Sequence, residues 1–83
     1  MSIDDIYFAI LDFNEDEIES LVEKELDAGT ELQQVLNDGL IAALDEVGRC
    51  FSEGSMFVPE MLMAAHTMKL GMDVLKPRIP RGD

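Results

Sequence analysis

Apolar residues recur at helical spacing along the first half of the chain. Residues 3–13 carry an apolar side chain every three or four positions, and the same spacing returns over residues 15–28 and 31–51. Because an α-helix turns by about 100° per residue, side chains three and four positions apart share a face. Asn14 precedes an acidic first turn, and Gly29 follows the second segment, as expected where helices start and end. The pattern predicts three amphipathic helices joined by tight turns.

Residues 54–77 predict a fourth helix, which is more apolar than the other three. Gly54 and Ser55 suit a turn, Pro59 suits the first helical turn, and Pro77 prevents the helix from continuing. The face expected to join the core carries Met61, Ala65, Met68, Met72 and Leu75. A second face of mostly small or apolar residues carries Glu60, Met63, Ala64, Thr67, Leu70, Gly71 and Val74.

The apolar arc of this fourth helix is roughly twice as wide as the slightly more than 100° that a surface helix needs. The second face is therefore expected to bury something outside the bundle: a ligand, another domain or another subunit. The chain shows no strand pattern or internal repeat, so we predict an all-α fold, a four-helix bundle of antiparallel-like helices. Its 83 residues suffice for one small domain, expected over residues 1–77, and residues 78–83 have the composition of a linker.

Charge divides the chain unevenly. Residues 1–54 hold 15 Asp and Glu against 2 Lys and Arg, whereas residues 55–83 hold 3 against 4. A net charge of −12 argues against nucleic acid and against anionic membrane surfaces as partners, because both require clustered cations. Five of the six methionines lie between Met56 and Met72, which marks the near-neutral part as the working surface.

The chain lacks the residues of a self-contained catalyst. His66 is the only histidine, so no Glu-x-x-His or His-x-x-x-His metal motif exists, and a surface position suits it better than a ligand role. No apolar run is long enough for a membrane helix, and no signal peptide is visible. A single cysteine, Cys50, fits a reducing compartment. We expect a cytoplasmic, non-catalytic module.

One family combines these features. The third and fourth predicted helices resemble the N-terminal helical cap domain of corrinoid (vitamin B12) carrier proteins of methyltransferase systems. The matching module of cobalamin-dependent methionine synthase is similar. The residues that carry the resemblance are Gly39-Leu40, Asp45-x-Val47-Gly48, Phe51, Met56-Phe57-Val58-Pro59-Glu60-Met61-Leu62, Ala64-Ala65, Met68-Lys69 and Leu75-Lys76-Pro77.

The resemblance implies a lid over the upper face of cobalamin during methyl transfer between a pair of methyltransferases. Carried over by position, Phe57, Ala64 and Thr67 would face the ring. The wheel adds the other residues of the expected cofactor-binding set, Glu60, Met63 and Gly71. An apolar lid keeps water and oxygen from a reactive cobalt.

The resemblance also implies partners: a Rossmann-like corrinoid-binding domain, and a substrate-specific methyltransferase. In the family that domain carries an Asp-x-His-x-x-Gly motif, which this chain lacks, so the chain is expected to be a fragment of a longer carrier or a stand-alone cap. Alone, it is expected to bind corrinoid weakly or not at all. The alternative is a helical interaction module without cofactor. In either case a homodimer through the exposed apolar face is expected.

Overall fold

The computed structural model describes residues 2–79, which form helices and no strand, so the predicted all-α fold is confirmed. The helices are α1 (Ile3–Leu11), α2 (Glu15–Asp27), α3 (Leu32–Gln34), η1 (Val35–Ile41), α4 (Ala42–Glu53), α5 (Val58–Leu75) and η2 (Lys76–Arg78). Because α3, η1 and α4 follow one another without a break, they act as one long helix, the third of four. The linker expected over residues 78–83 lies mainly outside the described residues.

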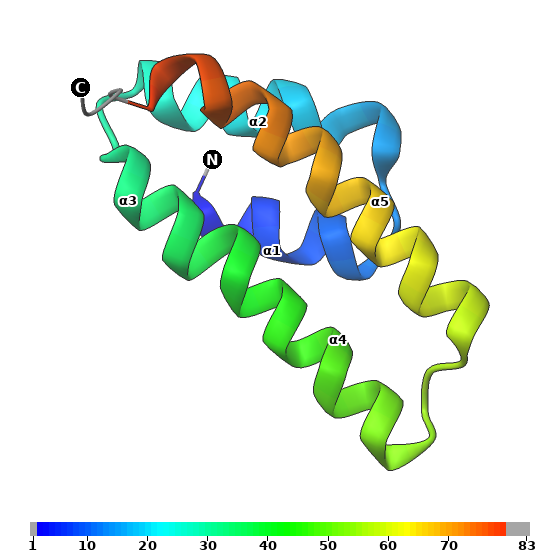
Figure 1. Ribbon diagram of the computed structural model, residues 1–83. Coiled ribbons are helices and arrows are strands. Elements are labelled where there is room, and N and C mark those ends of the chain that lie inside the picture. Colours follow the sequence, from blue (N-terminus) through cyan, green and yellow to red (C-terminus); the bar gives the residue numbers. More distant parts are fainter. Residues whose placement is uncertain (1, 80–83) are drawn as a thin grey trace.

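The four helices form two hairpins that pack on each other. Helices α1 and α2 form one hairpin, and the long third helix forms the other with α5 (Figure 1). Consecutive helices run antiparallel, as expected, but α2 and α5 pack against each other in the same direction. The expectation of antiparallel neighbours is therefore wrong for this pair. Both helices consequently end near the start of α3.

The middle of the third helix, η1, is a π-helix. A turn closed by i→i+5 hydrogen bonds contains more residues than the 3.6 of an α-turn. The buried residues of this helix include Val35, Gly39, Ala43 and Val47, which are spaced by four. In a pure α-helix that spacing would rotate the last of them by about 120° relative to the first. The wider π turn reduces this rotation and keeps the four residues facing the core.

Helix α5 contributes its smallest side chains to the core. Ala64, Thr67 and Leu75 are 0% exposed, and a Cβ added to Gly71 would lie 3.1 Å from Leu40 and 3.3 Å from Ile18. Of the core stripe predicted for this helix only Leu75 is fully buried. Met61, Met68 and Met72 are half-buried and pack against the edge of the core, and Ala65 is half-buried. Small residues lie inside because α5 packs too closely on α2 and η1 to admit a methionine there.

The start of α5 is fixed by Glu60. Its side chain accepts a hydrogen bond from the backbone N–H of Phe57, the N-cap residue, at 3.0 Å. We expect Glu60→Ala to lower the free energy of unfolding by about 0.5–1 kcal/mol, because that N–H loses its partner. Glu23→Ala, which removes an exposed carboxylate from the middle of α2, is the control. Urea unfolding followed by circular dichroism measures both, and equal effects would contradict the capping role.

Candidate functional site

The end of the α4–α5 hairpin carries the largest group of exposed apolar side chains in the described part of the chain. We call this surface the tip face; it consists of Phe51, Phe57, Val58, Met61 and Leu62. Four of them are well exposed: 42% for Phe51, 70% for Phe57, 50% for Val58 and 61% for Leu62. Met61 is half-buried beside them. An exposed apolar cluster of this kind marks a binding surface.

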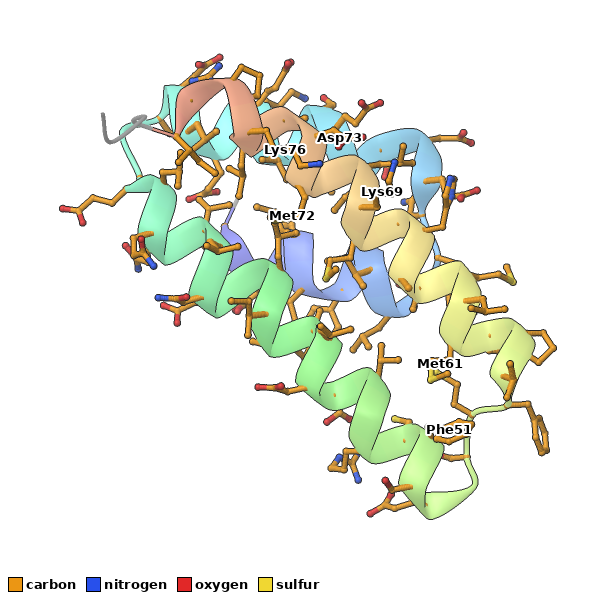
Figure 2. All side chains as sticks on the ribbon, in the orientation of Figure 1. Phe51, Met61, Lys69, Met72, Asp73 and Lys76 are labelled. Carbon is orange, nitrogen blue, oxygen red and sulfur yellow. The ribbon has the colours of Figure 1, made fainter. Side chains whose placement is uncertain are left out.

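Two helices meet to build the tip face. Figure 2 shows Phe51 of α4 and Met61 of α5 beside each other, in the space between the two helices at the hairpin end. Gly54, with φ +81°, ends α4 in the left-handed conformation that glycine adopts easily, so the chain can turn back at once. Met56, 9% exposed, anchors the turn to the core. The hairpin end is therefore held in shape although its outer side chains are exposed.

The acidic groups nearest the tip face in sequence have partners of their own. Glu60 caps α5, and Glu53 forms an ion pair with Arg49 at 2.7 Å. Arg49 also donates to Glu46, and this hydrogen bond is the main reason that the pKa of Glu46 lies below its usual value. The tip face itself contains no charged residue, which suits an apolar or flat aromatic-like partner better than an ionic one.

The structure does not expose three of the six residues expected to line a cofactor. Ala64 and Thr67 are 0% exposed, and Gly71 is buried against Leu40, Ile18 and Val22. Thr67 donates its hydroxyl hydrogen bond to the carbonyl oxygen of Met63 at 2.9 Å. The expectation that these residues form an outer face is wrong, since they are the face that holds α5 on the bundle.

The other three expected residues lie at different places. Phe57 belongs to the tip face, whereas the carboxylate of Glu60 is engaged in capping. Met63 is 50% exposed, but it follows Met61 by two positions and so points about 160° away from it around α5. The tip face therefore retains one of the six, Phe57.

Sequence reasoning missed four members of the tip face: Phe51, Val58, Met61 and Leu62. All four lie inside the motifs that carry the family resemblance, but the wheel assigned Met61 to the core and Leu62 to the wet face. The signal that could have found them is their position at the two ends of one tight turn. Residues on either side of a helix–helix connection meet at the hairpin end whatever the rest of the bundle does.

Two ion pairs join α5 and its continuation to α2. His66 pairs with Glu15 at the start of α2, and Arg78 of η2 approaches Asp27 at its end, 3.5 Å away. Glu15 and Asp27 are 12 residues apart on α2, and His66 and Arg78 are also 12 residues apart. Equal spacing on both sides is expected where two helices run parallel to each other. All four side chains are at least 44% exposed, so each pair contributes little energy but marks the register.

The described residues enclose no pocket, and no three His, Cys, Asp or Glu side chains among them gather as metal ligands. None of the helices over residues 2–79 is both long and apolar enough to cross a membrane. Tyr7, packed near α4, has a raised pKa because burial disfavours its charged form.

The described residues form an all-helical bundle with an apolar hairpin end. Comparison with known proteins identifies the family. The model of the B12 binding domain family matches residues 2–76. A corrinoid protein of Desulfitobacterium hafniense is 34% identical over 79 residues, which cover 95% of this chain and 37% of that protein. Trimethylamine corrinoid protein 1 of Methanosarcina acetivorans is 38% identical over 73 residues, which cover 88% and 34%.

The fold agrees with these relatives. The structure of the Methanosarcina barkeri monomethylamine corrinoid protein matches 89% of this chain and 35% of its own, with a TM-score of 0.85 and 27% identity. The chain belongs to the B12-binding domain family, as the helical domain of corrinoid proteins. It spans about a third of the length of the relatives it matches.

Proposed function

We propose that the tip face covers the upper face of a corrinoid while the methyl group is carried between two methyltransferases. The observation that carries the proposal is the cluster of five apolar residues, four of them well exposed, at one hairpin end in a chain of the B12-binding family. A flat macrocycle fits such a surface, because it needs apolar contact on one side and no enclosing pocket. When bound, the corrinoid supplies a cobalt that carries a methyl group.

The residues of this chain have three tasks in the proposed function. Phe51 and Phe57 cover the ring with aromatic surface, and Val58, Met61 and Leu62 extend this cover along α5. Together they exclude water and oxygen from the cobalt, which protects a reactive centre. Ala64, Thr67 and Gly71 hold α5 against α2 and η1, so that the tip face keeps its shape. We assign no catalytic residue to this chain.

The proposed function requires two partners. One is a Rossmann-like domain that holds the corrinoid from the opposite side, and the other is a substrate-specific methyltransferase. Two of the relatives are named for trimethylamine and monomethylamine, so methylated amines are the class of substrate that we propose for the system. A cytoplasmic location accords with the single unpaired Cys50.

The test is to isolate the gene product that contains these residues from its source cells and to record its mass and visible absorbance. We expect a chain two to three times as long as these 83 residues, coloured by corrinoid with one equivalent per chain. A colourless product that takes up no added methylcobalamin would overturn the proposed function.

In the absence of a ring the same surface should pair two copies, because exposed apolar clusters associate. Light scattering on the 83-residue chain is expected to show a dimer at high concentration, which Phe57→Asp converts to a monomer. Phe8→Asp, which changes an equally apolar and 56% exposed side chain on α1, should leave the dimer intact.

A further inference from the structure

The short connection between α4 and α5 is held at every residue. It consists of Gly54, Ser55, Met56 and Phe57 (Figure 1). The backbone N–H of Gly54 donates to the carbonyl oxygen of Phe51 at 3.1 Å, and that of Ser55 to the carbonyl oxygen of Cys50 at 3.0 Å. With Gly54 in the left-handed conformation, these two bonds form a Schellman motif, which satisfies carbonyl groups at a helix end. Met56 is held by its burial in the core, since it is only 9% exposed.

Ser55 adds a side-chain hydrogen bond to this motif. Its hydroxyl donates to the carbonyl oxygen of Cys50 at 3.1 Å, so this carbonyl accepts both the N–H and the O–H of one residue. The residue at this place in a Schellman motif frequently makes a hydrophobic contact with the helix. Here the residue is polar and exposed, and the hydroxyl bond takes the place of that contact. Ser55 therefore ties the connection to the last turns of α4.

Glu60 holds the other end of the connection. Its carboxylate accepts a hydrogen bond from the N–H of Phe57 at 3.0 Å, and the carbonyl oxygen of Phe57 accepts one from the N–H of Met61 at 3.0 Å. The backbone of Phe57 is thus bonded through both of its polar groups, whereas its side chain is 70% exposed. Because the core gives that side chain little support, the backbone decides where its phenyl ring lies.

This degree of fixation is more than a turn between two packed helices requires. Loops are usually more mobile than the helices that they join. An exposed Phe57 side chain adds little to the packing of the bundle, whether its backbone is fixed or mobile. A fixed backbone is useful to a binding surface, because a preorganised side chain loses less conformational entropy when a partner covers it. The hydrogen bonds around Phe57 therefore point to its role in the tip face.

We propose that Ser55 and Glu60 are positioning residues, which hold Phe57 where its phenyl ring covers the corrinoid. The inference rests on the proposed function and extends it, because it gives a role to two polar side chains to which we assign no contact with the ring. Each acts through the backbone of the connection, Ser55 from the α4 side and Glu60 from the α5 side.

The first test measures the mobility of Phe57 in the 83-residue chain without any corrinoid, by NMR relaxation of the backbone amides. The natural chain is expected to give an order parameter of about 0.85 at Phe57, and Ser55→Ala combined with Glu60→Ala to lower it to about 0.6. Ser55→Thr combined with Glu60→Gln keeps a hydroxyl donor and a carbonyl acceptor, and should restore the natural value. The matched control is Ser52→Ala combined with Glu23→Ala, which makes the same chemical changes at exposed positions outside the connection.

The second test measures how fast the reduced corrinoid is oxidised by air in the full-length carrier. Ser55→Ala combined with Glu60→Ala is expected to raise this rate about fivefold, a factor that the loss of one hydrogen bond can supply. In a carrier that already has Phe57→Ala, the same two changes should have no further effect, because they act through Phe57. A change that only weakened the fold would instead add to the effect of Phe57→Ala.

Three results would overturn the inference. An unchanged order parameter at Phe57 would show that the two side chains do not hold it. An unchanged oxidation rate would show that a fixed Phe57 is not needed to cover the ring, and a further rise on top of Phe57→Ala would show an effect on the whole bundle. The failure of the proposed function is read separately, from a natural carrier that contains no corrinoid.

Discussion

Leu40→Ala is expected to lower the free energy of unfolding by about 3 kcal/mol, whereas Leu44→Ala on the same long helix should change it by less than about 0.5 kcal/mol. Leu40 is 0% exposed and lies against Gly71, where α5 comes closest to η1. Its removal leaves a cavity that α5 cannot fill, because the residue facing it has no side chain. Leu44 points outward and leaves no cavity.

The measurement is thermal unfolding of the two variants beside the natural chain. A loss of 3 kcal/mol corresponds to a fall in melting temperature of roughly 12–24 °C for a chain of this size. A fall of similar size for Leu44→Ala would mean that the side chain of Leu44 is buried in solution. A small effect of Leu40→Ala would mean that α5 does not pack on η1 as described.

The close packing of α5 explains what the sequence could and could not predict about this helix. Periodicity identified its bounds and its excess of apolar surface correctly, because both depend on residue type and spacing alone. It could not decide which of two apolar arcs faces the core. Size favoured Met61 and Met68 as core residues, but the distance between α5 and α2 favoured Ala64 and Gly71. That distance is set by side chains such as Ile18 on the other helix.

The third helix shows a similar limit. Its length and its end before Gly54 agree with the prediction, because a glycine with φ +81° follows it. The π-helix over Val35–Ile41 was not predicted, although buried residues spaced by four are its mark in the sequence. Gly39 lies close to another helix, since a Cβ added there would be 3.2 Å from Ile6 of α1. Gly48 differs, since a Cβ added there would meet nothing within 4 Å in the described chain.

The sequence identified a motif that contains most of the tip face, but it did not predict which of the motif residues are exposed. The motif residues from Met56 to Leu62 were identified together, and the structure distributes them between the core and the surface. Met56 is buried, whereas Val58 and Leu62 are exposed. Which side of the turn each residue takes depends on the angle between α4 and α5, which no local pattern in the sequence encodes.

Phe51→Ala combined with Val58→Ala is expected to speed the air oxidation of the reduced corrinoid about tenfold in the full-length carrier that contains this domain. The two side chains are 42% and 50% exposed in this chain, so the fold loses little when they are shortened. If they cover the ring, their loss opens a path for water and oxygen to the cobalt. Absorbance of the protein-bound corrinoid, followed after mixing with aerated buffer, measures the rate.

The matched control is Phe8→Ala combined with Ile79→Ala, which removes exposed apolar side chains, 56% and 39% exposed, from α1 and from the residue that follows η2. The control should oxidise at the rate of the natural carrier, because these residues lie outside the tip face. Equal oxidation rates for the two double variants would contradict the assignment of the tip face as the lid. A faster rate for Phe51→Ala with Val58→Ala alone, at an unchanged melting temperature, would separate covering the cofactor from stabilising the bundle. That separation follows from the packing of α5, whose inner face of Ala64, Thr67 and Gly71 maintains the fold while the hairpin end remains exposed.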